Sequence, residues 1–378
     1  MFHNGRPMFT RRIAPIALAA LFALTGSGFA AAATDWQLVK LHNRDYLTVD
    51  NVAEFYGLPS KSTPADKRVR FANARNSLEF ELDSREVMIN GVRNWLCFPV
   101  TEQNGQYLVA RVDLSKTIEP QLRPQMITNL GQFKTVVIDP GHGGYDKGAV
   151  SPYGYEKDFA LDVAKNLKPL LELKGLNVKM TRDSDIFVPL ELRARIANAA
   201  KDAVFVSIHF NATDANPAAN GFEIYSLTPR GAPSTQDDAL ALRFMNMQAG
   251  SPVDAPSLAL SMSVYHSVLG HFNECDRGIK RARFAVLRLT KIPAILVEGG
   301  FLTEQGESRL VAKSAWRAKL AEAIATGIGN YKELVDHHTR PMTVVDYRRD
   351  EGALVLRDIN PPAKLESSSA PAIIPAAN

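Results

Sequence analysis

Three short segments that follow Phe133 are almost wholly apolar, namely TVVIDP, AVFVSIHF and AILVEGG. An extended chain with apolar side chains on both faces must be buried on both sides, as in a parallel sheet covered by helices. Between the first two segments, residues 156–173 repeat apolar side chains at helical spacing. This alternation constrains the fold most strongly, because strands and amphipathic helices in turn build an α/β layered domain.

The α/β pattern extends over residues 133–333 and predicts a mostly parallel central sheet with helices on both faces, of phosphorylase/hydrolase-like type. Further strands are predicted in NVKMTR, GFEIYSL and FAVLRL, and further helices in LELRARIANAA, in a segment from near Ser257 and in WRAKLAEAIATGIGNY. Residues 334–378 are predicted to be a C-terminal extension whose low-complexity end is disordered.

Residues 34–125 have a different pattern from the α/β region. The segment LEFELDSREVMINGVRNW alternates apolar and polar residues around turn-forming DSRE and NG, as β-hairpins do. We therefore predict a small β-rich accessory domain in front of the α/β domain. Its pattern indicates a module that localises or regulates the main domain rather than one with its own chemistry.

The first 33 residues have the features of an export signal. Three arginines precede the 12-residue apolar run from Ile13 to Leu24, and small residues follow up to Ala33. This run is too short to span a bilayer and has the length of a signal-peptide core. Arg11 and Arg12 leave a twin-arginine signal open, but an ordinary Sec signal is favoured. We expect an exported protein of the periplasm, with no transmembrane helix in the mature chain.

Charge and cysteine content narrow the class of partner. The chain has 44 basic and 40 acidic side chains, and without the arginines of residues 1–33 the counts become 41 and 40. A near-neutral mature chain gives no electrostatic reason to expect nucleic acid as a partner. Cys97 and Cys275 lie in different predicted domains. Export permits a disulfide between them, but we expect both to be free and buried.

Polar side chains end three of the predicted apolar strands. His142 follows the first strand, His209 and Asn211 end the third, and Glu298 lies in the last. Ligands of open α/β sheets gather at the carboxyl ends of the strands. Glu156 opens the helix after the glycine-rich loop, so the sequence predicts that these groups meet.

Two histidines and a glutamate are a common ligand set of catalytic zinc, which keeps one further position for water. The metal lowers the pKa of that water and polarises a carbonyl oxygen, while a separate carboxylate moves the proton. His142, Glu156 and His209 are therefore predicted to bind zinc, with Glu298 as the base. Glycines beside His142, in PGHGG, allow a sharp turn and close approach of the metal.

Each of these residues also has a purely structural interpretation. A single histidine after an apolar strand is usually packed in the core, and a glutamate at a helix start is favoured by the helix dipole. Glu298 in an apolar strand is harder to explain in this way, because a buried carboxylate is costly without a partner or a proton. Spacing alone therefore leaves both interpretations open.

Four longer segments, in one order, resemble the motifs of the zinc-dependent N-acetylmuramoyl-L-alanine amidases of bacterial cell-wall remodelling. They are IDPGHGGYDKGA, EKDFALDVAKNLKPLLE, TRDSDIFVPLELRARIANAAKDAVFVSIHFNA and DRGIKRARFAVLRLTKIPAILVEGGFLT. The resemblance implies that one zinc ion is bound by His142, Glu156 and His209, and that Glu298 is catalytic. It also implies hydrolysis of the amide between the lactyl group of N-acetylmuramic acid and L-alanine in peptidoglycan.

The resemblance extends to three finer points. Asn211 matches the asparagine that follows the second histidine in the family, where a role in substrate binding is implied. Arg288 is a candidate for binding a substrate carboxylate, with a surface salt bridge as the alternative. Glu304 stands where many relatives carry asparagine, which affects the loop after the predicted base and leaves the chemistry unchanged.

Residues 228–256 have the features of an insertion before the helix near Ser257. Some members of the family carry here a helix that covers the zinc until an activator protein removes it. By that resemblance, residues 236–248 could form such a helix, with Asp237 or Asp238 reaching the open position of the metal. The alternative is a loop that shapes the substrate groove.

Two other functions compete with an amidase. A zinc peptidase that trims stem peptides commonly places its first ligands in an H-x-x-E motif, whereas 13 residues separate His142 from Glu156. A non-catalytic peptidoglycan-binding protein on the same scaffold would be expected to lack the base or a ligand, and all four groups are present. The sequence therefore favours an exported zinc amidase with peptidoglycan as its substrate.

Overall fold

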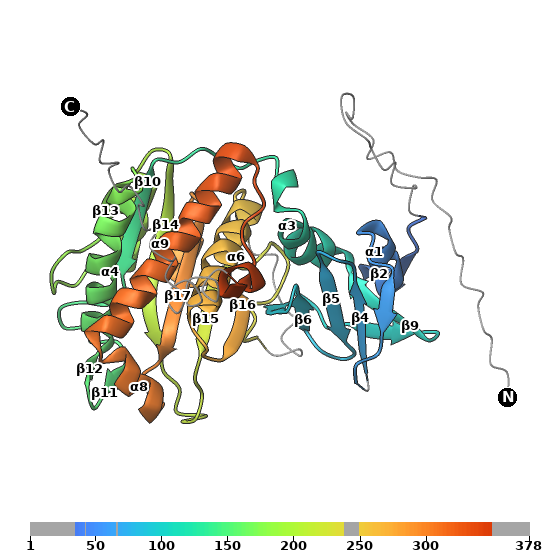
Figure 1. Cartoon of the computed structure of the whole chain (residues 1–378), viewed down its shortest axis with the longest axis horizontal. Coiled ribbons are helices and arrows are strands. Elements are labelled where there is room, and N and C mark those ends of the chain that lie inside the picture. The colour runs from blue at the N-terminus through green and yellow to red at the C-terminus, as the bar shows by residue number, and fades with distance from the viewer. Residues whose placement is uncertain (1–34, 42, 66, 238–248, 350–378) are drawn as a thin grey trace, which may run out of the picture.

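The computed structural model describes residues 35–41, 43–65, 67–237 and 249–349. These residues form one sheet of 11 strands with helices on both faces, a separate sheet of four strands and a small two-stranded ribbon (Figure 1). The predicted signal peptide and the end of the predicted C-terminal extension lie outside the described residues. No helix among the described residues is both long enough and apolar enough to cross a membrane.

The strands predicted from the α/β pattern form one end of the large sheet. Four of them are parallel and adjacent in the order β13 (Asn177–Met180), β10 (Thr135–Pro140), β14 (Ala203–Asn211) and β17 (Ala294–Phe301). Next to β17 comes the antiparallel strand β15 (Phe222–Leu227), and beside it β16 (Asp276–Ala282) runs parallel to β15. The carboxyl ends of the four parallel strands therefore share one edge, which the beginning of β15 also reaches.

Helices cover both faces of this sheet, as the sequence predicts. α4 (Glu156–Leu173), α6 (Asp254–His271) and α9 (Ser314–His337) pack on one face around a core that includes Val136 and Ile324 (Figure 1). The opposite face carries α5 (Leu190–Asn198) and α7 (Ala285–Leu289) around Phe205. α8 (Gln305–Val311) follows β17. The α/β fold is confirmed. Within the part of this sheet that the α/β region forms, only the pairing of β15 with β17 is antiparallel, whereas the sheet of 11 strands as a whole is mixed.

One predicted strand is wrong. FAVLRL contains the whole of helix α7, and the strand lies earlier in the chain, at β16. The sequence DRGIKRA of β16 is polar, yet two of its cations are buried. Each has a buried acidic partner distant in sequence, which the local pattern does not reveal. Lys280 lies 2.7 Å from Glu223, and Arg281 lies 2.9 Å from Asp254.

The N-terminal region has a core of its own, which includes Leu78 and Phe80. The predicted hairpins are present. Its elements are the four-stranded sheet of β1 (Leu38–Leu41), β2 (Arg44–Thr48), β9 (Gln106–Ala110) and β8 (Thr101–Gln103), helix α1 (Val49–Phe55), and the antiparallel run β3 (Ser60–Ser62), β4 (Arg68–Ala72), β5 (Ser77–Glu81), β6 (Glu86–Ile89) and β7 (Val92–Trp95). Short helical segments then connect it to the α/β region, namely α2 (Arg111–Asp113), a π-helical turn (Leu114–Ile118), α3 (Glu119–Leu122) and a 3₁₀ turn (Pro124–Met126).

The N-terminal region also continues the large sheet, which the sequence did not indicate. Strand β7 pairs with β16 in parallel, with Asn94 opposite Ile279. The backbone N–H of Arg93 donates to Asp276 Oδ2 at 2.7 Å, and Trp95 Nε1 donates to the carbonyl of Arg277 at 3.3 Å. The two regions are therefore joined by strand pairing as well as by the chain.

The C-terminal extension begins inside the fold. Helix α9 continues to His337, and residues 344–349 are helical. Tyr347 is buried, and a Cβ on Gly270 of α6 would lie only 2.4 Å from its side chain. Both cysteines are free, as expected. Cys97 is buried, but Cys275 is exposed, because it lies in the loop before β16 rather than in a strand.

A buried ion pair of the α/β region, which also contacts the segment that connects the two regions, gives a first prediction. Arg281 and Asp254 have side chains that are 4% and 5% exposed, and Arg281 Nη2 also donates to the carbonyl of Lys116 at 2.6 Å. Arg281→Met leaves Asp254 without its closest charge partner, so we expect the free energy of unfolding in urea to fall by about 3 kcal/mol or more. Arg349→Met, which removes an exposed ion pair, should cost less than about 1 kcal/mol. Equal losses in the two variants would contradict this assignment.

Candidate active site

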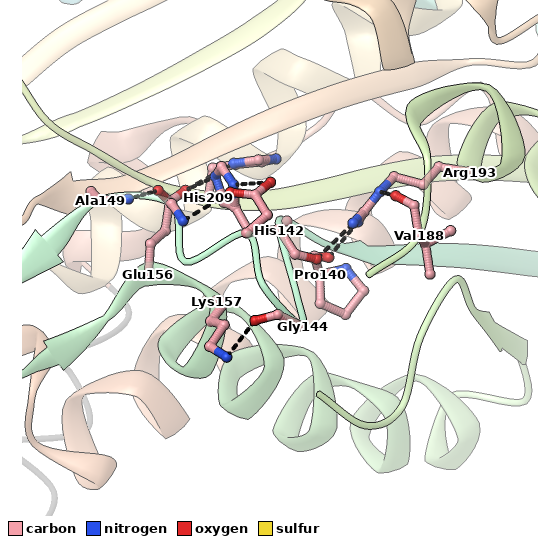
Figure 2. A network of polar contacts seen from close by, with 12 residues as sticks. Pro140, His142, Gly144, Ala149, Glu156, Lys157, Val188, Arg193 and His209 are labelled. Atoms are coloured by element: carbon pink, nitrogen blue, oxygen red, sulfur yellow. Dashed lines mark hydrogen bonds and ion pairs between the residues drawn. The ribbon is translucent and has the colours of Figure 1, made fainter. Parts of the chain in front are cut away.

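Two imidazoles converge on one carboxylate oxygen at the carboxyl edge of the sheet. Glu156 Oε1 lies 3.0 Å from His142 Nε2 and 2.9 Å from His209 Nδ1 (Figure 2). One ligand atom from each of the three residues lies within 4.8 Å of the others. The structure therefore brings together the three residues that the sequence predicts as metal ligands.

Glycines next to the two histidines make this approach sterically possible. A Cβ on Gly141 would lie 2.3 Å from His209 Cε1, and a Cβ on Gly148 would lie 2.5 Å from Glu156 Oε2. His142 itself has a positive φ of 58°, the left-handed conformation that the turn after β10 imposes. The glycine-rich loop therefore serves to seat an imidazole against a second imidazole and a carboxylate.

Two buried arginines, which the sequence analysis missed, hold this loop in place. Arg193 on α5 donates to the carbonyls of Pro140 at 2.6 Å and His142 at 2.6 Å, and it is paired with Asp139 at 2.8 Å (Figure 2). Arg182, after β13, donates to the carbonyl of Gly141 at 2.7 Å. Arginine supplies several donors in one fixed plane, so each side chain satisfies several loop carbonyls at once. Arg193 could have been found from the sequence, because it interrupts the otherwise apolar face of the predicted helix LELRARIANAA.

Hydrogen bonds orient the carboxylate and one imidazole. Glu156 Oε2 accepts from the N–H of Ala149 at 2.8 Å, and Oε1 accepts from the N–H of Phe210 at 3.1 Å. Burial opposes ionisation of Glu156, but hydrogen bonds from the two histidines outweigh it and hold its pKa well below the usual range. Asp146 Oδ2 lies 2.9 Å from His142 Nδ1, on the side of the ring away from Glu156.

The pKa of His142 reflects two opposing effects. Burial favours the neutral ring, but the carboxylates of Glu156 and Asp146 outweigh burial and raise the pKa. When Nδ1–H donates to Asp146, Nε2 keeps its lone pair on the side of Glu156 and His209. The ring is therefore oriented to bind a cation through Nε2.

Glu298 lies beside this cluster on the neighbouring strand. β14 and β17 are parallel, and Glu298 is directly opposite His209 in their register. Its Oε2 is buried and has no hydrogen-bond partner among the residues that the structure describes. Burial, together with the negative charges of Glu156 and Glu223, raises the pKa of Glu298 well above the usual range. A buried carboxyl oxygen without a protein partner points to a water or a ligand as its partner.

A polar network borders Glu298 on the other side. Glu223 on β15 is opposite Glu298 in the antiparallel register and is only 2% exposed. Its Oε1 accepts from Lys280 at 2.7 Å and from Arg277 at 2.6 Å, and its Oε2 accepts from Tyr225 at 2.5 Å. This network could not be predicted from the sequence, because its two cations lie on β16, a strand without an apolar pattern.

Comparison with known proteins places this geometry in a family. The family described as N-acetylmuramoyl-L-alanine amidase matches residues 136–330, just over half of the chain. The chain belongs to this family. The resemblance predicted from the motifs is thus confirmed, and the matched residues contain every member of the cluster as well as Glu298.

Two curated relatives of this chain support the same assignment. The chain is 35% identical over 240 residues to the amidase AmiC of Neisseria meningitidis serogroup B, covering 58% of this chain and 57% of the relative. It is 31% identical to AmiA of Escherichia coli K12, covering 61% of this chain and 86% of the relative. Among solved structures, the amidase AmiC2 of Nostoc punctiforme is 36% identical, with 53% of this chain and 98% of that chain covered and a TM-score of 0.44.

The structure places the remaining predicted residues at different distances from the cluster. Asn211 lies two residues after His209 and donates to Glu223 Oε2 at 3.1 Å, so it joins the network beside Glu298. Glu304 is the N-cap of α8 and accepts from the N–H of Glu307 at 2.6 Å, a role that asparagine also fills.

Arg288 does not reach the site. It is exposed on α7, which connects the end of β16 to the start of β17 at the opposite edge of the sheet. Among the described residues, no hydrogen bond or ion pair of its side chain is present. We therefore do not assign a substrate carboxylate to Arg288.

Asp237 is held within its own loop. Its Oδ2 accepts from the N–H of Ser234 at 2.7 Å, and its backbone carbonyl accepts from Arg85 of the N-terminal region at 3.4 Å. No described contact joins its carboxylate to the histidine cluster. Asp238 lies outside the described residues. So does the helix expected over residues 236–248, except for Gln236 and Asp237.

The contact between Gly141 and His209 gives a second prediction. Gly141→Ala would force His209 away from Glu156, because the added methyl would lie 2.3 Å from the ring. A displacement of about 1 Å in such a site costs about 100-fold in rate, so we expect a loss of that size in amide hydrolysis. Gly131→Ala is the matched control, because no atom lies within 4 Å of its added methyl. Equal activity in the two variants would show that the loop can relax around the methyl group.

Proposed function

We propose that this chain is a zinc-dependent N-acetylmuramoyl-L-alanine amidase. It hydrolyses the amide between the lactyl group of N-acetylmuramic acid and L-alanine of the stem peptide, in cell-wall remodelling or daughter-cell separation. The observation that carries the proposal is the convergence of His142 and His209 on one oxygen of Glu156, with Glu298 opposite His209 in the sheet.

The donor set fits one zinc ion. Two imidazole nitrogens and one carboxylate oxygen are the ligands of many catalytic zinc sites, and Asp146 orients His142 in the way that outer carboxylates orient zinc-binding histidines. The crowding of Glu156 Oε1 between two ring nitrogens is favourable when a proton or a cation lies among them. A bound zinc ion would acidify a water and polarise the amide carbonyl.

Glu298 would move the proton. Hydrolysis requires a group that takes a proton from the attacking water and gives it to the leaving nitrogen of L-alanine. The buried, unpaired Oε2 of Glu298 is available for that water, and a raised pKa suits a group that must both accept and donate a proton near neutral pH. The hydrogen bond from Asn211 to Glu223 would hold the two strands on either side of Glu298 in place.

The setting of the reaction follows from the sequence. The segment of residues 1–33 supports export, and a periplasmic location agrees with a peptidoglycan substrate. Control by an activator protein is proposed from the family resemblance of residues 228–256 alone, and a loop that shapes the substrate groove is the alternative. Neither rival function gains support from the geometry, because the first two ligands are far apart in sequence and all four expected groups are present.

Substitution of the base tests the proposed activity. Purified mature protein would be incubated with peptidoglycan sacculi, and the released material identified by mass spectrometry. We expect free stem peptides that begin with L-alanine, and their loss when a zinc chelator is added. Glu298→Gln should reduce their release by about 10²- to 10⁴-fold, because the amide cannot carry the proton.

Glu322→Gln on the exposed face of α9 is the matched control for that experiment and should keep full activity. Shortened stem peptides that are still attached to sugar would identify a peptidase instead. An unchanged rate in Glu298→Gln would exclude Glu298 as the base while leaving the amidase assignment intact.

The contact of Asp146 with His142 gives a prediction on metal affinity. Asp146→Ala removes the partner of Nδ1, so the ring loses its orientation, and we expect zinc to bind about 10- to 100-fold more weakly. The measurement is competition with a chromophoric chelator, which needs no turnover. Asp183→Ala, at an exposed position beyond β13, should bind zinc as the unsubstituted protein does. If Asp146→Ala bound zinc as tightly as the unsubstituted protein, the backbone of His142 alone would orient its ring.

A further inference from the structure

One cation at the edge of the site has no role in the steps above. Arg277 is the second residue of β16, and β16 is parallel to β15, with Asp276 opposite Phe222. Phe222 precedes Glu223, which is opposite Glu298 on the next strand. Arg277 therefore lies at the same edge as the histidine cluster, two strands away from Glu298.

Two contacts fix the guanidinium of Arg277, and a third fixes its backbone. Its Nε donates to Glu223 Oε1 at 2.6 Å, its central carbon lies 4.7 Å from the centre of the Phe301 ring, and its backbone carbonyl accepts from Trp95. Among the described residues, its terminal nitrogens Nη1 and Nη2 have no hydrogen-bond partner. The side chain is 32% exposed, so these two donors are both held in place and open to a ligand.

Glu223 already has a cationic partner without Arg277. Lys280 already pairs with Glu223 at 2.7 Å, and both of these side chains are at least nine-tenths buried. The other oxygen of Glu223 accepts from Tyr225 and Asn211. Since Glu223 and Lys280 form a neutral pair with satisfied oxygens, Arg277 contributes one positive charge that no acid in this network balances. Its free edge matches a carboxylate, which binds two parallel N–H donors.

We propose that Arg277 binds a free carboxylate of the stem peptide next to the scissile amide, and so selects the acid form of the substrate over the amide form. This inference rests on the proposed amidase function and adds the feature of the substrate that the site recognises. The residue after L-alanine in the stem is glutamate linked through its side chain, and its α-carboxyl group can be free or amidated. Only the free acid offers two acceptor oxygens and a negative charge to Nη1 and Nη2.

A matched pair of substrates tests the proposal. Two disaccharide-tetrapeptide muropeptides, identical except for a D-glutamate or a D-isoglutamine residue after L-alanine, would be supplied to the zinc-loaded full-length mature protein. We expect the unsubstituted enzyme to show a kcat/KM about 10- to 100-fold higher for the acid, the size of a charge-assisted hydrogen-bonded contact. Arg277→Gln should bring the two values together by lowering the value for the acid.

Two further variants separate recognition from folding. Arg277→Lys keeps the charge but loses the paired donors, so it should retain only part of the preference. Arg288→Gln, at the opposite edge of the sheet, should retain all of it. The ratio of the two kcat/KM values is taken within each variant, so a smaller folded fraction cancels.

The outcomes distinguish this proposal from the one it rests on. If the unsubstituted enzyme releases L-alanyl peptides from both substrates at equal kcat/KM, or if Arg277→Gln keeps the preference, the role of Arg277 is overturned and the amidase function stands. If neither muropeptide nor sacculi yield L-alanyl peptides, the amidase function itself fails. A preference that disappears in Arg277→Gln and persists in Arg288→Gln supports the assignment.

Discussion

The contact on which the rest of the site depends is that of two imidazole nitrogens, each within 3.0 Å of one carboxylate oxygen. Such a cluster is costly to bury unless a proton or a cation compensates for the crowded lone pairs and the charge. The protein meets this cost by rigidity, because glycines remove every obstructing methyl and Arg193 and Arg182 fix the loop carbonyls. The strands must also end level with one another so that their last side chains meet, and the register of β10, β14 and β17 ensures this.

The parts of this arrangement that could be predicted from the sequence are those with a local signature. Apolar strands and amphipathic helices gave the α/β fold, and histidines at strand ends gave His142 and His209. Glu156 was found because it opens a helix, and Glu298 because a carboxylate in an apolar strand needs an explanation. In each case one short segment contained the whole signal.

The parts that could not be predicted are those whose stability comes from partners distant in sequence. β16 contains Lys280 and Arg281, which are buried only because Glu223 and Asp254 lie opposite them. A strand of this kind has no apolar pattern, so the pattern instead predicts a strand in the nearby apolar run of α7. For the same reason the sequence does not reveal Arg277, since only the topology shows that it lies at the edge of the histidine cluster and that Arg288 lies at the opposite edge.

The pairing of β7 with β16 has a consequence for how this protein can be divided. Without residues 34–125, β16 would become the outermost strand of the large sheet and would present a row of unpaired backbone N–H and C=O groups to solvent. Open edges of this kind recruit strands from other molecules and lead to aggregation. The N-terminal region thus protects the edge of the amidase sheet by pairing with its last strand. Its boundary in the chain is not a boundary at which the fold can be cut cleanly.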